Sequence, residues 1–340
     1  MMKLELPRWT SHHNMIIYSL LYYSYENKEN LDIVFNSSIK LNGAVLYTGD
    51  SVIFFDYSDD IIFIDDPNCY DFYFKRSFLS SKNTFQNVYS LNFQVNFSYK
   101  SLNLLSRFNF KELTNRNNRT EIFRALDFFN LFTNMSHNAM DIRFFPKKVN
   151  DNKGNVIFQT RLWNPNNHED LIEKNRREIQ NEFRIEACKI IQKNFKNVSV
   201  GIFPDHLSLK MAPEYVLDLK SISKKHYFNS LKNSSIGIAD DGLKNTPGWK
   251  IGEYLLFGKA IITTPISTSV DNFNESVNYE KLTCRNSYSE LPEKIEYLLN
   301  GNRYLEMGQN NLIWSENYLH PKNYIKRILS VIKSNDHINI

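Results

Sequence analysis

The chain has 340 residues, of which 42% are hydrophobic and 23% charged, a composition typical of globular proteins and long enough for two domains. The formal net charge of +4 is too small to indicate a nucleic-acid-binding protein, although it is compatible with phosphorylated substrates or with loose attachment to anionic lipid. The three cysteines form no C-x-x-C motif, so we expect neither a disulfide framework nor a zinc site, and a reducing cytosol fits.

The first half of the sequence predicts an open α/β sheet, because strand patterns alternate with helical ones. Apolar runs predict strands at 2–6, 31–36, 44–48, 52–55 and 61–64, and a strand leading into a loop at 70–79. The spacing of apolar residues predicts helices at 14–25 and 119–132. The stretch 15–25 is too short to span a bilayer and lacks a cleavage site, so we expect a packed core helix in a cytoplasmic protein.

A polar stretch at 147–155 predicts a linker, after which a second α/β pattern begins. It predicts strands at 156–160, 198–203, 235–239 and 259–264, and helices at 168–195, 224–233, 288–300 and 321–333. We therefore expect domains at 1–150 and 151–317, with a C-terminal segment, 318–340, whose helix can cross back to the first domain.

The stretch 240–265 predicts a strand, loop, helix and strand whose loop–helix junction can hold a phosphorylated ligand. Thr246 is expected to cap the helix, Pro247 suits its first position and Gly258 ends it. A helix start presents N–H groups and a partial positive charge to an anion. Lys250 adds a full charge in the first turn, and Glu253, three residues on, can bind the vicinal hydroxyls of a ribose.

Arg161 directly follows the first strand of the second domain, where ligands of open α/β sheets bind. A guanidinium at that place can bind a diphosphate through two hydrogen bonds. Taken alone, Arg161 fits a surface or interdomain salt bridge better than a ligand contact. Its combination with Lys250 and Glu253 favours a nucleotide site.

The text GEYLLFGKAIITT at 252–264 resembles the donor site of GT-B glycosyltransferases. The pattern G-L-x-x-x-x-G-W-K-x-G-E-Y at 242–254 and TRLWNP at 160–165 resemble a group of bacterial surface-polysaccharide transferases. The resemblance implies two Rossmann-like domains facing each other across a cleft. It implies transfer of a sugar from a nucleotide-sugar donor to an oligosaccharide or lipid-linked glycan acceptor, in capsule, O-antigen or lipopolysaccharide synthesis, with no metal or other cofactor and with peripheral contact to the inner membrane as an option.

Carried over to this sequence, the donor-binding residues are Arg161, Asp241, Gly242, Gly248, Trp249, Lys250 and Glu253. Only the second glutamate of the family's E-x7-E pair has a match, because Asn245 occupies the place of the first. Two alternatives stay open: a nucleotide-sugar 2-epimerase on the same fold, and a non-catalytic glycan- or nucleotide-binding subunit of a polysaccharide assembly complex.

Three residues of the first domain are candidates for the catalytic group. His12 and His13 follow the first predicted strand, and an imidazole titrates near neutral pH. Asp56 follows another strand, and a carboxylate there can take the acceptor proton. Tyr73, Lys75 and Arg76 can guide an acceptor, or form an edge strand with exposed cations.

Overall fold

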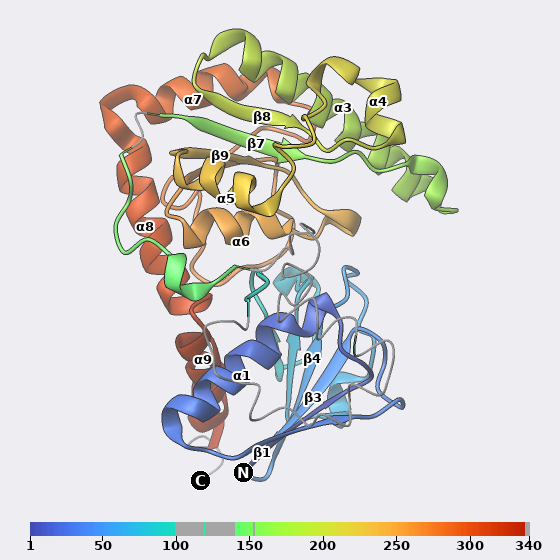
Figure 1. Cartoon of the computed structure of the whole chain (residues 1–340). Helices are drawn as coiled ribbons and strands as arrows, with labels where there is room; N and C mark the ends of the chain where they lie inside the picture. The colour runs from blue at the N-terminus through green and yellow to red at the C-terminus, as the bar shows by residue number, and fades with distance from the viewer. Residues whose placement is uncertain (99–118, 120–139, 152–153, 337–340) are drawn as a thin grey trace. The chain divides into compact units, whose positions relative to one another are not determined.

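The computed structural model describes residues 1–98, 119, 140–151 and 154–336 (Figure 1). The chain forms two compact units and passes between them four times along its length. Unit 1 comprises Met1–Phe145, Thr268–Asp271 and Glu316–Ile340, and unit 2 comprises Pro146–Ser267 and Asn272–Ser315. None of the helices in the described ranges is both long and apolar enough to cross a membrane.

Unit 1 is built on a six-stranded mixed sheet with the order β2-β1-β3-β4-β5-β6. Its strands are β1 (Met2–Leu6), β2 (Leu31–Phe35), β3 (Gly43–Thr48), β4 (Ser51–Asp56), β5 (Phe72–Lys75) and β6 (Val88–Ser90). The strand β3 runs antiparallel to both of its neighbours, and the other pairs are parallel. A tight turn joins β3 and β4, and Gly49 in this turn has a φ of +57°, which suits glycine.

Two helices of unit 1 pack against each other, α1 (Asn14–Asn27) and α9 (Pro321–Asp336). Most side chains in the first half of α1 are buried, so the apolar stretch near the N-terminus is a packed core helix, as the sequence predicts. The predicted helix at 119–132 lies, apart from Arg119, outside the described residues.

Unit 2 contains a parallel five-stranded sheet with the order β11-β10-β9-β7-β8. Its strands are β7 (Val156–Thr160), β8 (Val198–Ile202), β9 (Ile236–Ala239), β10 (Ala260–Thr263) and β11 (Glu280–Lys281). Every residue of β7, β9 and β10 is buried, which explains why these strands are continuous apolar runs rather than alternating ones. The α/β class predicted from the sequence is confirmed.

The helices of unit 2 are α3 (Leu171–Asn194), α4 (His206–Met211), α5 (Lys224–Lys232), α6 (Trp249–Leu256) and α7 (Leu291–Leu299), followed by α8 (Arg303–Tyr318). The sequence analysis predicted four of these helices to within a few residues. It missed two: α4, which is a short helix of about one and a half turns with a capped start, and α8. The core of the unit lies between the sheet and α3 and α7, and Cys188 is buried in it, so this thiol is a packing residue.

One predicted strand is wrong. Residues 61–64 form a loop whose backbone makes hydrogen bonds to two buried charged side chains. The carbonyl of Ile62 accepts from Lys75, and the amide of Ile64 donates to Asp56. Ile62 is 70% exposed, so the apolar run does not reflect a buried strand.

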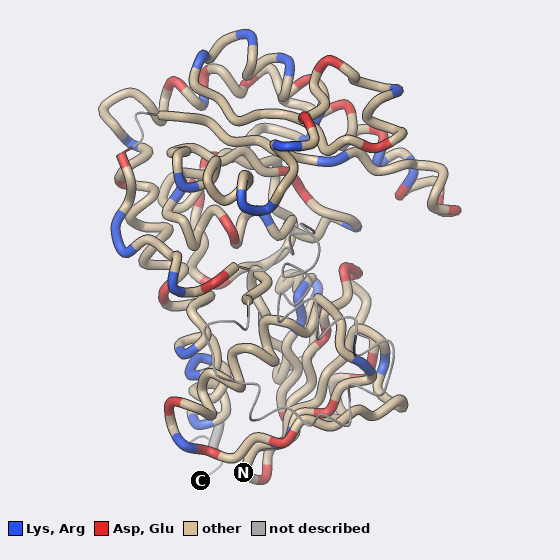
Figure 2. Tube along the Cα trace, viewed as in Figure 1, with Lys and Arg blue, Asp and Glu red and all other residues tan. Residues whose placement is uncertain are grey.

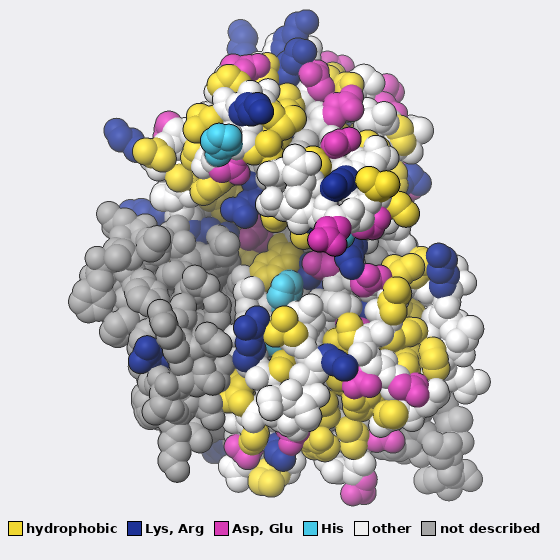
Figure 3. Space-filling view, turned by 90° about the vertical axis from the view of Figure 1, so that its right-hand side faces the viewer, with side chains coloured by type: hydrophobic (Ala, Val, Ile, Leu, Met, Phe, Trp, Pro, Cys, Tyr) yellow, Lys and Arg dark blue, Asp and Glu magenta, His cyan; other side chains and the backbone are white. Residues whose placement is uncertain are grey.

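Lysine, arginine, aspartate and glutamate are distributed along both units, with the two signs intermixed (Figure 2). On the face drawn in Figure 3, acidic and basic side chains again lie among hydrophobic ones. The arrangement agrees with a low net charge that is not concentrated in one basic stripe, which nucleic-acid-binding proteins usually present.

Candidate functional site

The order in which the strands are added to the sheet of unit 2 reverses between β7 and β9. From β7 the chain continues to β8 on one side, and after β8 it crosses to β9 on the other side. Ligands of open parallel α/β sheets bind outside the carboxyl ends of the strands at such a switch point. Arg161 follows the end of β7 and Asp240 follows the end of β9, so the topology brings two predicted segments to this one place.

Arg184 of α3 joins these two strand ends. Its Nε lies 2.7 Å from Oδ2 of Asp240, and its Nη1 donates to the carbonyl oxygen of Arg161 at 2.5 Å. Both charged side chains are buried, so the pair is shielded from solvent. Sequence reasoning missed Arg184, because a helix dense in alternating charges does not show which charges face inward.

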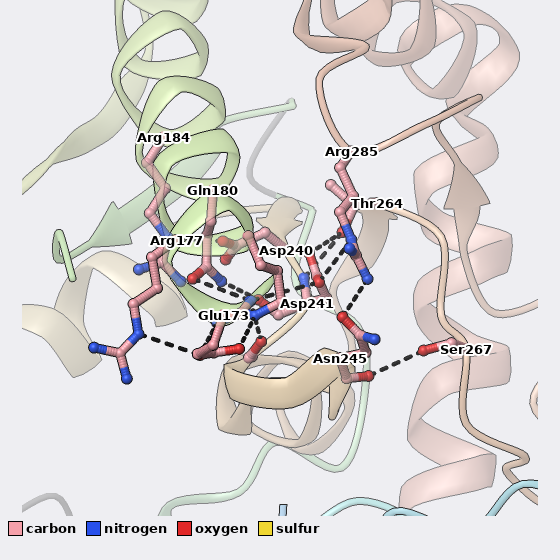
Figure 4. A network of polar contacts seen from close by, with 12 residues as sticks. Glu173, Arg177, Gln180, Arg184, Asp240, Asp241, Asn245, Thr264, Ser267 and Arg285 are labelled. Atoms are coloured by element: carbon pink, nitrogen blue, oxygen red, sulfur yellow. Dashed lines mark hydrogen bonds and ion pairs between the residues drawn. The ribbon is translucent and has the colours of Figure 1, made fainter. Parts of the chain in front are cut away.

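Further polar side chains of α3 hold the loop that follows β9 (Figure 4). Arg176 donates from Nη1 to the carbonyl of Gly242 at 2.8 Å, and Gln180 donates to the carbonyl of Asp241. Glu173 in turn pairs with Arg176 at 2.7 Å. Burial raises the pKa of the Glu173 carboxyl, but Arg176 and Arg177 outweigh burial and hold it below its usual value. The loop is therefore fixed to the helix by charge-assisted hydrogen bonds.

Asp241 points into the unit rather than outward. Thr264 donates to its Oδ1 at 3.2 Å, and Arg285 lies 2.9 Å from its Oδ2. Burial, with the neighbouring charge of Asp240, raises the pKa of Asp241, although Arg285 and Arg176 act in the opposite direction. In this structure the predicted donor-binding residue Asp241 anchors the loop, and its place as a ligand contact stays a prediction.

The loop between β9 and α6 has an unusual backbone. Lys244 and Asn245 both have left-handed φ values, +51° and +65°. Arg285 binds the Asn245 side chain, and Ser267 donates to the Asn245 carbonyl at 3.1 Å. A Cβ on Gly242 would lie 2.5 Å from the backbone oxygen of Thr246, so only glycine fits there. Such strain in a loop held by its surroundings is a common feature of functional sites.

The helix α6 starts two residues later than the sequence suggested. Its N-cap is Gly248 and its first residue is Trp249, so the expected cap at Thr246 is wrong. Thr246 is buried, and its amide closes a turn onto the carbonyl of Leu243 at 3.0 Å, so its hydroxyl is not at a helix end. The predicted end of α6 at Gly258 is confirmed, with a φ of +59°.

Lys250 lies in the first turn of α6 and is half-buried. Within the described part of the chain, no side chain or carbonyl forms an ion pair or hydrogen bond with its ammonium group. Burial lowers the pKa of Lys250 to about 8; the cations Arg184 and Lys224 act in the same direction, and Glu253 and Asp240 oppose them. A cation kept without a partner in such a place can pair with an incoming anion.

Glu253 lies one turn further along α6, and its carboxylate is bound by two residues of α5. Lys224 Nζ lies 3.0 Å from Oε1, and the phenol of Tyr227 donates to Oε2. Burial raises the pKa of Glu253, but Lys224, Lys250 and Tyr227 together hold it below its usual value. Glu253 is therefore an ionised carboxylate, which the proposed contact with sugar hydroxyls requires.

The other predicted donor residues lie in the same unit. Arg161 is exposed, and its guanidinium packs over the rings of Trp163 and Phe203, with 5.6 Å and 5.3 Å to the centroids. Gly248 and Trp249 supply the start of α6, where backbone N–H groups have no intrahelical acceptor. The sequence analysis thus placed these residues around one loop and one helix start.

The predicted catalytic carboxylate, Asp56 at the end of β4 in unit 1, is completely buried and bound by five donors. Its Oδ1 accepts from the amide and hydroxyl of Ser58, and its Oδ2 accepts from Tyr73 at 2.7 Å, Lys75 at 2.8 Å and the amide of Ile64. Lys75 is also buried, so Asp56 and Lys75 form an internal ion pair.

The two predicted catalytic histidines differ in burial. His13 is completely buried, contacts the ring of Tyr57 edge-on at 5.4 Å, and places Nδ1 3.1 Å from the carbonyl of Arg8. Burial lowers the pKa of His13 to about 3, with His12 acting in the same direction. His12 is half-buried, with Nδ1 3.4 Å from Nη1 of Arg76. Burial and Arg76 lower its pKa, while Asp59 opposes them.

The segment around β5 also differs from expectation. Tyr73, Lys75 and Arg76 are all buried, and β5 lies between β4 and β6, so it is not an edge strand with exposed cations. Arg76 pairs with Asp59 at 2.7 Å. The alternation of aromatic and basic residues therefore reflects internal charge pairs, which a pattern of residue types does not distinguish from a basic surface.

Among the described residues, no three His, Cys, Asp or Glu side chains are grouped so that they could hold a metal ion. In comparisons with protein-family models and with curated proteins, nothing matches the chain.

Several solved structures are similar to the chain at low identity. One is the C-terminal domain of a glycosyl transferase group 1 family protein (LpcC) from Francisella tularensis, with a TM-score of 0.37 and 13% identity over 53% of this chain and 97% of that one. A glycosyltransferase from Rickettsia africae has a TM-score of 0.37 and 9% identity, over 78% of this chain and 63% of its own. The pneumococcal O-GlcNAc transferase GtfA, solved with UDP and GlcNAc, has a TM-score of 0.34 and 13% identity, over 64% of this chain and 43% of its own. Each of these three solved structures is named as a glycosyltransferase.

Proposed function

We propose that the chain is a glycosyltransferase that moves a sugar from a nucleotide-sugar donor to a glycan acceptor of a bacterial surface polysaccharide, without a metal or a further cofactor. The observation that carries the proposal is Lys250, a half-buried cation without an ion pair in the described chain. It lies one turn from the ionised carboxylate of Glu253, on the helix that follows the switch-point strand β9. One cation and one carboxylate in that order suit a ligand with both phosphates and hydroxyls.

In this proposal the diphosphate is bound by Lys250, Arg161 and the backbone start of α6 at Gly248 and Trp249. During transfer, the bond between the anomeric carbon and the phosphate oxygen breaks, and its electron pair goes to the leaving diphosphate. Positive charges that are fixed around the diphosphate before the reaction stabilise the negative charge that develops on it in the transition state. The helix start adds a partial positive charge in the same position.

Glu253 is proposed to accept hydrogen bonds from the two ribose hydroxyls of the donor. A carboxylate offers about four lone-pair sites, and the residues of α5 use two of them. The remaining capacity fits a vicinal diol.

For the proton of the acceptor hydroxyl, we propose His12 of unit 1 rather than His13 or Asp56. His12 keeps part of its side chain accessible, and its lowered pKa keeps the imidazole neutral at pH 7. A His12→Gln variant should then lower turnover while nucleotide binding stays unchanged. Loss of nucleotide binding in this variant would contradict the assignment.

A thermal-shift series with UDP, GDP, CMP, dTDP and the matching nucleotide sugars tests the proposal. A nucleotide at 100 times its dissociation constant should stabilise the protein by about 2.7 kcal/mol. Glu253→Gln and Lys250→Met should each weaken binding at least about tenfold, because each removes a charged contact. Lys225→Met removes an exposed charge one residue from Lys224 and should bind like the wild type. No shift with any member of the series would overturn the proposed function.

A second candidate function is nucleotide-sugar binding without transfer. The observation that favours it is Asn245, which stands where the family's first glutamate is expected and whose side chain is held by Arg285. An NMR time course with donor alone, and then with donor and acceptor, separates the candidates. A product that forms only when the acceptor is present supports transfer. Conversion of the donor in the absence of acceptor indicates an epimerase. Binding of the donor with no product under either condition indicates the second candidate function.

A further inference from the structure

The first turn of α5 contributes two side chains to Glu253 of α6. Lys224 and Tyr227 are three residues apart, so they lie on the same face of their helix. Lys224 binds one carboxylate oxygen at 3.0 Å, and Tyr227 donates its phenol hydrogen to the other. The carboxylate of Glu253 is therefore held at both oxygens by one neighbouring helix.

This arrangement is rigid because each contributing side chain is itself held. The ammonium of Lys224 lies 4.6 Å from the ring centroids of both Tyr227 and Phe228, which is cation–π distance. Ser223 caps α5 by accepting from the amide of His226 at 3.2 Å. Phe228 stacks on Phe257 at the end of α6, with ring planes 20° apart. The start of α5 is thus packed against α6.

The two lysines near Glu253 are not equivalent. Lys224 forms an ion pair with the carboxylate. The same carboxylate raises the pKa of Lys250 but forms no ion pair with it. If Lys224 were absent, the charge of Glu253 would be left for Lys250 to neutralise, because Glu253 is the first of the two anions that raise the pKa of Lys250. Lys224 therefore satisfies Glu253 and leaves Lys250 available to another anion.

We propose that Tyr227 and Lys224 are positioning residues of the donor site: Tyr227 orients the Glu253 carboxylate for the ribose hydroxyls, and Lys224 neutralises it so that Lys250 stays free for the diphosphate. The inference rests on the proposed function. Neither residue needs to touch the ligand, and nothing in the sequence patterns marks them, since they belong to a different helix from Glu253.

Two substitutions separate these roles, Tyr227→Phe and Lys224→Met, with Lys225→Met as the matched control. Calorimetry measures the dissociation constants of three probes: the member of UDP, GDP and CMP that binds the wild type tightest, its 2′,3′-dideoxy analogue, and inorganic pyrophosphate. The ratio of the first two constants reports the ribose contact, and pyrophosphate reports the phosphate contact alone. A general loss of structure would abolish binding of all three probes, whereas the expected changes are limited in size and, for Lys224→Met, shift the pH at which pyrophosphate affinity falls.

Tyr227→Phe keeps the buried ring, and we expect it to reduce the preference for ribose over dideoxyribose about tenfold, with pyrophosphate binding unchanged. Lys224→Met should weaken pyrophosphate binding about fivefold to tenfold, because Lys250 then pairs with Glu253. Lys225→Met should match the wild type in all three measurements.

The pH dependence of pyrophosphate binding gives a second measurement on Lys224→Met. The charged groups that face Lys250 are Glu253 of α6, Arg184 of α3, Lys224 of α5 and Asp240 after β9. Removing Lys224 removes one cation from this set, so the pKa of Lys250 rises. The fall in affinity that begins near pH 8 in the wild type should then begin at higher pH.

The outcomes distinguish the inference from the proposed function. A wild type that binds none of the three nucleotides overturns the inference, and one that binds no member of the thermal-shift series overturns the proposed function as well. A wild type that prefers ribose, together with a Tyr227→Phe variant that prefers it equally, overturns the role of Tyr227 alone. Unchanged pyrophosphate binding and an unchanged pH profile in Lys224→Met overturn the role of Lys224.

Discussion

Each unit of the molecule contains a buried carboxylate that is paired with a lysine. The two pairs differ in how many of the nearby hydrogen-bond donors, acceptors and charges are satisfied within the chain. Asp56 of unit 1 has five donors, and the ammonium of Lys75 donates to Asp56, to Ser58 at 3.2 Å and to the carbonyl of Ile62 at 3.0 Å. All three ammonium hydrogens are used. Glu253 of unit 2 has two donors, and a second lysine nearby has no pair among the described residues.

The difference distinguishes a structural ion pair from the proposed donor site. Burying two charges is costly, and the cost is offset only when each lone pair and each hydrogen has a partner. The Asp56–Lys75 pair meets that requirement within the chain, so it has no capacity for a substrate. The surroundings of Glu253 and Lys250 do not, and a ligand with phosphates and hydroxyls would complete them.

The largest expected effect is on unit 1. Asp56→Ala leaves Lys75 buried without its counter-ion, and we expect a loss of about 3–5 kcal/mol in the free energy of unfolding, measured by chemical denaturation. Asp32→Ala on the exposed face of β2 is the control and should stay within about 0.5 kcal/mol of the wild type. The double variant Asp56→Asn, Lys75→Met should recover part of the loss. An Asp56→Ala variant as stable as the wild type but without turnover would break the comparison, because Asp56 would then be catalytic.

A second expectation concerns the buried His13. Its pKa is about 3 in the folded protein and 6.5 for the free side chain, so between these values the unfolded chain takes up a proton that the folded chain does not. The free energy of unfolding therefore falls as the pH is lowered from 6.5 towards 3, by about 2 kcal/mol between pH 7 and pH 5. His13→Gln should reduce this difference, measured by denaturation at both pH values. An equal difference in the variant would contradict the buried, neutral imidazole.

In unit 2, Gly242→Ala tests the loop that leads to α6. The added Cβ would lie 2.5 Å from the backbone oxygen of Thr246, so the loop must shift, at a cost of about 1–3 kcal/mol in unfolding free energy. The nearest atom to a Cβ on Gly248 is 3.4 Å away, so Gly248→Ala is the matched control and should be milder. Equal effects on stability and on nucleotide binding in the two variants would contradict the specific requirement for glycine at position 242.

The smallest effect on stability, but a clear one on binding, is expected for Lys250→Met. The folded pKa of about 8 lies below 10.5, so the ammonium is penalised at neutral pH and the penalty is relieved as the pH rises from 8 to 10.5. Removing the charge should therefore keep or raise the stability at pH 7 while weakening nucleotide binding about tenfold. Lower stability with unchanged binding would place Lys250 with Lys75, as a structural cation.

Several parts of the molecule follow from local sequence. The apolar runs of β7, β9 and β10 and the helix end at Gly258 were predictable because hydrophobic pattern and glycine conformation act over a few residues. The common helix of Lys250 and Glu253 was predictable for the same reason, since a three-residue spacing places two residues on one side of a helix.

The partners of these residues were not predictable. Arg184, Tyr227 and Arg285 reach Asp240, Glu253 and Asp241 across 56, 26 and 44 positions of chain respectively, counted as the differences between their residue numbers. No local pattern encodes such a contact. The sequence by itself determined most of the strands and helices, though not the loop at 61–64 or the helices α4 and α8, together with the residue types at the start of α6. Only the tertiary structure decided that Asp56 and Lys75 are buried as a pair and that Lys250 has no ion pair among the described residues. The burial and pairing of a charge depend on segments that meet only when the chain folds.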